Sequence, residues 1–286
     1  MQTIIHNNQL EITIHHKGAE LSSIKNKAGK EFLWQADSKF WPRHAPVLFP
    51  IVGKLKDNKY NHNRSTYSLP QHGFARDKMF YKKSESDDFV VLYLNSDVET
   101  QLHYPFEFEL MISYALIKNK LIVEYKVTNF GTGSMPFSIG AHPGFCCPID
   151  ADERFEDYAL QFEKAENLNR KLLVDGLFTE EEIPFLKNEK EVKLTNALFE
   201  RDAIVVQNFK SNFLSLTSAK HAVKVGISGF PYLGIWTKPG APFVCIEPWF
   251  GISDKESATG NLNEKEGIQI LDPQKEFSCS YTLEFS

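Results

Sequence analysis

Short runs in which apolar and polar residues alternate recur along almost the whole chain, and this period of two constrains the fold more than any other feature. Successive side chains of a β-strand point to opposite faces, so each run predicts a half-buried strand. The pattern predicts strands at Leu10–Ile14, Phe89–Leu94, Glu107–Ile117, Leu121–Val127, Tyr158–Phe162, Ala203–Val206, Phe213–Thr217, Val223–Ile227, Leu233–Thr237, Phe243–Ile246, Gly267–Leu271 and Phe277–Phe285.

The two central runs also predict how they pair. The apolar side chains of the two runs each fall on one face of a strand, and they are Leu110, Ile112, Tyr114 and Leu116, followed by Leu121, Val123, Tyr125 and Val127. The polar tripeptide Lys118-Asn119-Lys120 between them predicts a hairpin turn.

Many strands, few helical periodicities and an aromatic content of 13% predict an antiparallel all-β protein whose sheets close over a common core. We expect short helices only near Ser38–Trp41 and Thr179–Ile183. A chain of 286 residues can hold one large domain or two ordinary ones. No repeat or linker divides it, and the charged segment Thr179–Glu191 is interpreted as a surface excursion, so residues 1–286 are predicted to form a single domain.

Composition excludes several classes of partner. The net charge is −5 and no basic block is present, which argues against nucleic acid or an anionic membrane and favours a small neutral ligand. No signal-like segment and no run of about 18 apolar residues is found, so a cytoplasmic location is expected. The spacing of the four cysteines fits neither a disulfide framework nor a zinc site, and we expect reduced, mostly buried thiols.

His142 lies in a turn-rich stretch, Pro136 to Pro148, that fixes its position. Gly140, Pro143 and Gly144 set unusual backbone angles around it, so the imidazole is presented from a defined loop. The residues alone leave two interpretations open, a structural turn residue or a group that handles protons.

Glu247 follows an apolar run and precedes Trp249, and burial beside aromatic rings raises the basicity of a carboxylate. A solvated strand end is the alternative. His72 is either a hydrogen-bonding turn residue or part of a site. Arg43 and Arg76 can clamp sugar hydroxyls or an anion, or form structural ion pairs such as Arg76 with Asp77.

Aromatic residues beside these polar groups also have two interpretations. Trp41, Trp249 and Phe250 can belong to the core, or an aromatic ring among them can support the apolar face of a sugar.

Three ordered motifs resemble those of the aldose 1-epimerases, the galactose mutarotase superfamily. They are His72-Gly73-Phe74-Ala75-Arg76-Asp77, Gly140-Ala141-His142-Pro143-Gly144-Phe145 and Glu247-Pro248-Trp249. The first motif, with Ala45–Gly53 upstream, looks most like the LacX-type branch. The resemblance runs from Leu10 to Phe285 and implies a β-supersandwich with an open carbohydrate-binding cleft.

The resemblance also implies roles for these residues. His142 corresponds to the general acid, Glu247 to the general base and His72 to a second histidine that holds the sugar ring. Arg43 and Arg76 resemble substrate-contacting arginines, and Asp202 looks like a substrate-binding aspartate. The implied reaction opens and recloses an aldohexose ring by acid–base catalysis, exchanging α and β anomers without a cofactor.

Other interpretations remain open at this point. His72, His142 and Glu247 form a two-histidine, one-carboxylate set that can bind iron or zinc, although the three lie on distant loops. A non-catalytic sugar-binding protein needs the aromatics and arginines but not Glu247 and His142 together. A hexose 6-phosphate substrate stays open because Lys54 and Lys78 lie near the arginines in sequence, and either a monomer or a homodimer is expected.

Overall fold

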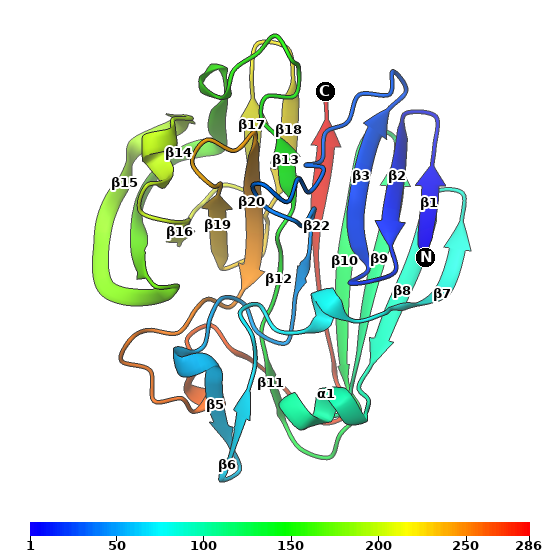
Figure 1. The fold of residues 1–286 in the computed structure, drawn as a ribbon, viewed down its shortest axis with the longest axis vertical. Helices are drawn as coiled ribbons and strands as arrows, with labels where there is room; N and C mark the ends of the chain where they lie inside the picture. Colours follow the sequence, from blue (N-terminus) through cyan, green and yellow to red (C-terminus); the bar gives the residue numbers. More distant parts are fainter.

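Antiparallel β-structure dominates the computed structural model, which describes all residues 1–286 (Figure 1). The first strands are β1 (Gln2–His6), β2 (Leu10–His15), β3 (Glu20–Asn26), β4 (Val47–Leu48), β5 (Lys59–His62), β6 (Ser65–Ser68), β7 (Tyr81–Ser86), β8 (Phe89–Asn95), β9 (Phe108–Ile117) and β10 (Lys120–Asn129). The later strands are β11 (Met135–Phe137), β12 (Ile139–Ala141), β13 (Gly144–Cys146), β14 (Ala159–Val174), β15 (Leu177–Lys193), β16 (Ile204–Gln207), β17 (Phe213–Thr217), β18 (Ala222–Gly226), β19 (Tyr232–Trp236), β20 (Phe243–Phe250), β21 (Gln269–Leu271) and β22 (Glu276–Phe285). The all-β prediction is confirmed.

Helical structure is sparse and short. One α-helix, α1 (Val98–His103), is capped by the side chain of Asp97, which accepts a hydrogen bond from the Thr100 amide at 2.7 Å. Single 3₁₀ turns occur at η1 (Lys56–Asn58), η2 (Ala75–Asp77), η3 (Phe155–Asp157), η4 (Asn196–Phe199) and η5 (Leu262–Glu264). No helix is long and apolar enough to cross a bilayer.

A sheet of 15 strands forms the body of the molecule. Its main path runs in the order β4-β12-β20-β19-β16-β14-β17-β18-β22-β10-β9-β8-β7, with β13 beside β20 and β15 beside β14. Strands from the beginning, middle and end of the chain therefore pair directly. The single domain expected for residues 1–286 stays a prediction.

Hairpin β9–β10 confirms the pairing predicted from alternation. Leu121 is paired with Leu116 and Val123 with Tyr114, so the predicted apolar faces coincide on one side of the sheet. Those side chains are buried, and Lys118 occupies the connecting turn with a φ of 56°. The register thus follows from burying one face, because a one-residue slip exposes the whole apolar set.

A second layer covers one end of the large sheet. Strands β1, β2 and β3 form a separate sheet that lies against β7 to β10 in Figure 1. The Tyr114 hydroxyl of β9 donates to the Ala19 carbonyl across the layers at 2.7 Å. Side chains of both layers belong to one core of 63 buried residues, which gives the other half of the sheet a rigid base.

Both predicted helices are wrong. Thr179–Ile183 belongs to β15, where pairing with β14 satisfies the backbone of an exposed, glutamate-rich segment that has good intrinsic helix propensity. Near Ser38–Trp41 the chain makes one hydrogen-bonded turn onto the Asp37 carbonyl, and Pro42 prevents its extension into a helix. The segment Thr179–Glu191 is nevertheless mostly exposed, as expected for a surface excursion.

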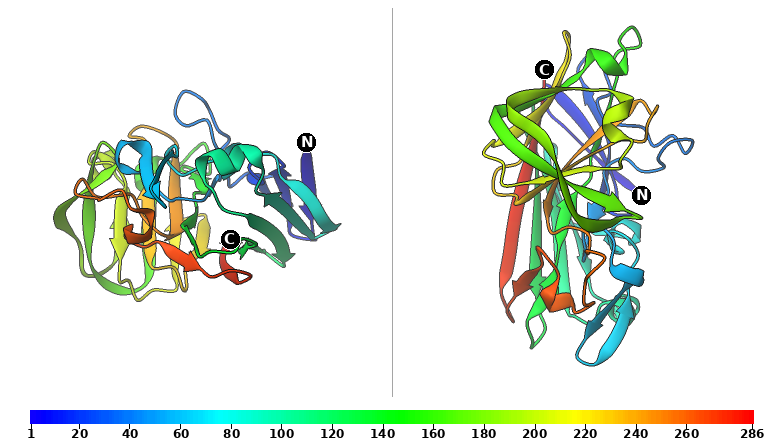
Figure 2. Two further views of the ribbon diagram at one scale, coloured as in Figure 1. Left: turned by 90° about the horizontal axis from the view of Figure 1, so that it is seen from below. Right: turned by 90° about the vertical axis from the view of Figure 1, so that its left-hand side faces the viewer.

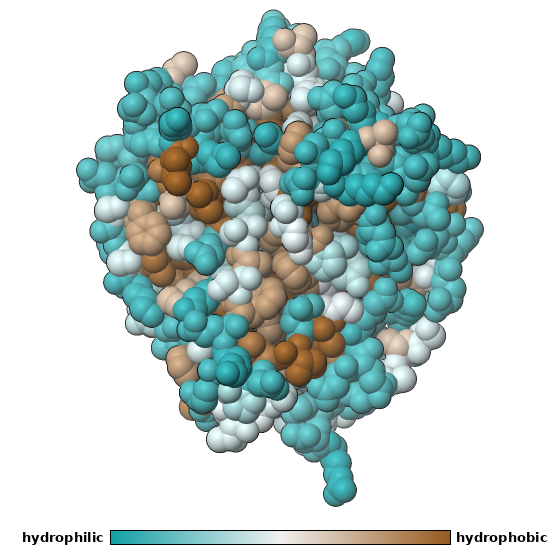
Figure 3. All heavy atoms as spheres, turned by 180° about the vertical axis from the view of Figure 1, so that it is seen from behind, coloured by the Kyte–Doolittle hydropathy of each residue, from teal (hydrophilic) through white to brown (hydrophobic).

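Hairpin β14–β15 curls around one side of the molecule, where the right-hand view of Figure 2 faces it. Seen from behind, the surface is mostly hydrophilic, with apolar side chains gathered in separate patches (Figure 3). The hairpin's turn, Asp175-Gly176, bends back toward Lys54, whose Nζ donates to the Asp175 carbonyl at 2.8 Å. This contact places the hairpin beside the cavity described next.

Candidate active site

A cavity of about 270 Å³ brings together most of the residues singled out in the sequence. This volume is close to the lower end of the ~300–1,000 Å³ typical of small-molecule sites. The lining residues are Trp41, Gly53, Gln71, His72, Arg76, His142, Leu173, Gly176, Phe178, Asp202, Ala203, Val205, Trp236, Glu247, Trp249 and Ser253.

Backbone pairing around β20 places His142 and Glu247 side by side. Strands β12 and β13 both pair with β20, Gly140 opposite Trp249 and Gly144 opposite Cys245. His142 lies in the short interruption between β12 and β13, and therefore beside the segment of β20 that carries Glu247. The turn that the sequence predicted around His142 is thus an interruption between two short strands.

The two side chains meet in a buried position. Nε2 of His142 lies 3.2 Å from Oε2 of Glu247, and the residues are only 8% and 1% exposed. Glu247 Oε2 and His142 Nδ1 have no hydrogen-bond partner in the protein. An unpaired buried polar atom is energetically costly, so a ligand that supplies the missing hydrogen bond is favoured. Both atoms are available for such a bond because no protein group occupies them.

Burial shifts both groups toward their neutral forms. Removal from water raises the pKa of Glu247 well above its ordinary value, and the nearby charge of Asp202 acts in the same direction. Burial lowers the pKa of His142 to about 3, and Arg76 and Arg43 act in the same direction. The direction for Glu247 agrees with the raised basicity expected for it and favours its carboxylic acid form over the carboxylate.

Aromatic rings fix the orientation of the His142 imidazole. Trp41 stacks on it with ring centroids 4.8 Å apart and an interplanar angle of 27°. Trp236 and His72 approach it edge-on at 5.8 and 5.6 Å. With these contacts on several sides, the ring is held in place before any ligand binds.

His72 adopts a left-handed backbone conformation with a φ of 67°, which is uncommon for a residue with a side chain. Its Nδ1 accepts a hydrogen bond from the Gly53 amide at 3.1 Å. Burial lowers the pKa of His72 well below its ordinary value, and His142 and Arg76 add to this effect. The ring is therefore neutral, with its proton on Nε2, the nitrogen that can donate to a ligand.

The two arginines have different positions. Arg76 lines the cavity, and its Nη2 donates to the Gln71 carbonyl at 2.6 Å. Arg43 is not among the lining residues, and its Nη2 donates to Asp77 Oδ1 at 3.1 Å. Asp77 also lies 3.8 Å from Nε of Arg76. The structural ion pair considered for Arg76 and Asp77 is present, and it includes Arg43.

Asp202 and Trp249 both reach the cavity. Asp202 lies in the loop before β16, with a φ of 65°. Trp249 is 6% exposed, and its Nε1 donates to the Ala141 carbonyl at 3.2 Å. Glycines in the two neighbouring strands, Gly140 and Gly234, leave room for its indole, because a Cβ on either would lie 2.6 Å from the ring.

Several lining residues were not singled out as site residues in the sequence. Trp236, Gln71 and Ser253 come from strands and loops of the sheet. Leu173, Gly176 and Phe178 come from hairpin β14–β15, whose Asp175-Gly176 turn is a strong hairpin signal between apolar residues. That signal predicts the hairpin itself but contains nothing to predict its contact with the cavity.

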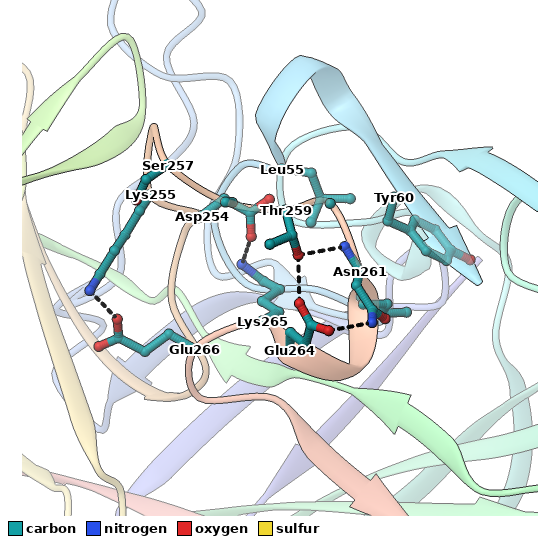
Figure 4. A pocket seen from close by; sticks show the side chains of 13 residues that line it. Leu55, Tyr60, Asp254, Lys255, Ser257, Thr259, Asn261, Glu264, Lys265 and Glu266 are labelled. Atoms are coloured by element: carbon teal, nitrogen blue, oxygen red, sulfur yellow. Dashed lines mark hydrogen bonds and ion pairs between the residues drawn. The ribbon is translucent and has the colours of Figure 1, made fainter. Parts of the chain in front are cut away.

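A second cavity of about 220 Å³ lies nearby, and its polar groups pair with one another (Figure 4). Lys265 Nζ contacts Asp254 Oδ1 at 2.8 Å, and Glu264 accepts from Thr259 and Asn261. No unpartnered buried side-chain atom belongs to its lining residues. The first cavity is therefore the candidate active site.

The fold and the first cavity define a galactose mutarotase-like β-sandwich protein. The chain belongs to the aldose 1-epimerase family, since the model of that family, "Aldose 1-epimerase", matches residues 1–283. It is 33% identical to the chromosomal protein LacX of Lactococcus lactis, covering 97% of each chain. This similarity agrees with the LacX-type resemblance of the motifs.

Solved structures agree over the whole length. A galactose mutarotase related enzyme from Lactobacillus acidophilus superposes with a TM-score of 0.96 at 35% identity, covering 100% of this chain and 97% of the other. A galactose mutarotase-like protein from Lactobacillus casei gives a TM-score of 0.92 at 32% identity, with 100% of both chains covered. These similarities confirm the fold class inferred from the sequence.

Proposed function

We propose that this protein is an aldose 1-epimerase that interconverts the α and β anomers of an unphosphorylated aldohexose. The observation that carries the proposal is the contact between His142 and Glu247, whose Nε2 and Oε2 atoms lie 3.2 Å apart at the cavity. Membership of the aldose 1-epimerase family supports the reaction class.

Anomer exchange needs one base and one acid that act on the two oxygen atoms bonded to C1. The base removes the proton from O1, the acid protonates the ring oxygen O5, and the ring opens to an aldehyde. Rotation about C1–C2 and the reverse steps close the other anomer. Because O1 and O5 are both bonded to C1, the acid and the base must lie close together, as His142 and Glu247 do.

We assign Glu247 as the base and His142 as the acid. During ring opening the carboxylate becomes a carboxylic acid and the imidazolium becomes a neutral imidazole. The pair gains one proton and loses one, so the number of protons that it holds stays the same. Burial favours the neutral state of both groups. The charged state that starts ring opening differs from it by one proton transfer within the pair.

The remaining cavity residues suit a neutral polyol. His72 supplies an Nε2–H donor, while Arg76 and Asp202 supply charged hydrogen-bonding groups at the lining. The indole of Trp249 and the ring of Trp41 give apolar surfaces of the kind on which a sugar face packs. A protein that only binds sugar needs these groups but gains nothing from an unpaired buried acid–base pair.

Three cations near the cavity, Lys54, Lys78 and Arg43, are already engaged, which favours a sugar without a phosphate. Arg76 is the arginine of the lining, and its Nε has no hydrogen-bond partner, so it is left to bind a hydroxyl of the sugar. Lys54 donates to the Asp175 carbonyl, and Lys78 pairs with Glu99 at 2.6 Å. Arg43 pairs with Asp77. A phosphate group binds most strongly to free donors, and these three would have to leave their present partners.

The test is the rate of anomer exchange by saturation-transfer NMR with glucose, galactose and their 6-phosphates. The proposal expects acceleration for a free sugar and its loss in Glu247→Gln, since an acid–base group contributes typically ~10²–10⁴-fold. Sugar binding without acceleration would instead identify a binding protein. Acceleration confined to the 6-phosphates would overturn the choice of substrate.

A further inference from the structure

Cys245 joins His142 and Glu247 in a buried group of three potential metal ligands. One ligand atom of each residue lies within 4.8 Å of those of the other two, and all three residues are buried. Cys245 and Glu247 are two positions apart on β20, so their side chains leave the strand on the same face. Cys245 is fully buried and is not one of the lining residues.

Two features of this cluster point to a ligand. Glu247 Oε2 is buried without a hydrogen-bond partner. The separation of 3.2 Å between Nε2 of His142 and Oε2 of Glu247 also suits a shared metal ion. Tetrahedral zinc with ligand distances of ~2.0–2.1 Å places its nitrogen and oxygen ligands about 3.3 Å apart.

We propose that His142, Cys245 and Glu247 bind one thiophilic divalent cation of the zinc type, and that this binding inhibits the enzyme. A thiolate, an imidazole and a carboxylate are the ligand set that zinc accepts in proteins. The inhibitory part of this inference depends on the proposed function, whereas the binding part does not.

The set differs from the two-histidine, one-carboxylate set considered from sequence. His72 does not belong to the three-ligand cluster, and its Nδ1 already accepts a hydrogen bond from Gly53. Cys245 takes its place. The metal-free enzyme and the metal-bound protein are therefore two states of one site, because the cation uses the same lone pairs that proton transfer needs.

A second cluster of potential metal ligands differs from this one in burial and in its charged neighbours. Asp150, Glu153 and His221 also lie within ligand distance of one another, but they are only partly buried. Lys30 pairs with Asp150, and Lys220 lies 3.8 Å from it. Protein cations thus pair with that cluster, whereas Glu247 Oε2 of the His142–Cys245–Glu247 cluster has no hydrogen-bond partner.

The experiment uses protein stripped with a chelator and titrated with Co²⁺ and Zn²⁺. Co²⁺ reports a cysteine ligand directly by thiolate-to-cobalt charge-transfer absorption, and Zn²⁺ then displaces it. We expect one equivalent of each, loss of the charge-transfer band in Cys245→Ser and Cys245→Ala, and an affinity for Zn²⁺ at least ~10–100-fold weaker in both. Cys147→Ser is the matched control, because Cys147 is as fully buried as Cys245.

Anomer exchange is measured on the same samples. Stoichiometric Zn²⁺ should suppress it, chelator should restore it, and the Cys245 variants should keep their metal-free rate while losing sensitivity to Zn²⁺. Unchanged Zn²⁺ affinity in both Cys245 variants, or no charge-transfer band in the wild type, would overturn the metal site. If no sugar is turned over, the absorption titration still tests the metal site independently of the proposed function.

Discussion

His142 and Glu247 lie 3.2 Å apart because the chain segments that carry them are paired through β20. The Ile246 amide donates to the Pro143 carbonyl at 3.3 Å, directly beside both residues. Their relative position is thus set by the backbone of the sheet and by the rings packed on His142, rather than by a hydrogen bond between them.

Replacing either Glu247 or His142 should slow anomer exchange about as much as replacing both. Glu247→Gln and His142→Asn should each lower the rate of anomer exchange by ~10²–10⁴-fold. The double variant should be close to the slower single variant, because groups that act as a unit are not additive. Two independent losses that multiply would show that Glu247 and His142 do not share one proton-transfer step.

His142 and Glu247 should have opposite effects on how stability depends on pH. The pKa of His142 is lowered in the folded state from 6.5 to about 3, so its contribution to stability is lost as the pH falls through this range. The pKa of Glu247 is raised, so its contribution is lost as the pH rises above its unfolded-state value. In the wild type these two contributions partly cancel between pH 5 and 7.

Single variants should separate the two effects. Going from pH 7 to pH 5, Glu247→Gln should lose unfolding free energy relative to the change in wild type. His142→Asn should gain up to about 2 kcal/mol over the same interval. Urea denaturation at the two pH values measures both, and equal pH slopes in all three proteins would contradict the assigned pKa directions.

Gly234→Ala should destabilise the floor of the cavity. A Cβ at this position would lie 2.6 Å from Cη2 and Cζ2 of Trp249, and overpacking of this kind costs ~1–3 kcal/mol. Gly133→Ala is the control, because a Cβ there meets nothing within 4 Å. Denaturation midpoints should fall for the first variant and stay close to wild type for the second.

Arg76 and Arg43 should differ in their effect on catalysis. Arg76 lines the cavity, so Arg76→Ala should lower kcat/KM by about 10–100-fold, corresponding to the ~1.5–3 kcal/mol of a hydrogen bond to a charged group. Arg43 contacts Asp77 from outside the lining, so Arg43→Ala should have a smaller effect. Equal losses in the two variants would show that both arginines contact the substrate.

Alternation predicted β9 and β10, in which every second side chain is buried, and it missed β7, β11 and β12, whose two faces are alike. Every side chain of β7 is exposed, while β11 and β12 are buried throughout, and neither pattern has a period of two. The helix predicted at Thr179–Ile183 was wrong for another reason, since pairing of this segment with β14 overrides its local preference for helix.

Most of the site residues that could be predicted from the sequence belong to the three motifs. His72, Arg76, Asp202 and Trp249 line the same cavity as His142 and Glu247, as the resemblance implied. Arg43, which was expected to contact the substrate, is not among the lining residues and pairs with Asp77. The proximity of Cys245 and the contribution of hairpin β14–β15 depend on strand pairing between distant segments, which local sequence does not specify.

The cavity wall and the reactive pair come from separate pieces of the fold. Leu173, Gly176 and Phe178 belong to hairpin β14–β15, which is fastened by backbone hydrogen bonds between Phe178 and the loop at Asp254. His142 and Glu247 belong to the paired strands around β20. Residues at the hairpin tip can therefore be substituted without moving the pair, so the shape of the cavity mouth and the geometry of proton transfer can be altered independently.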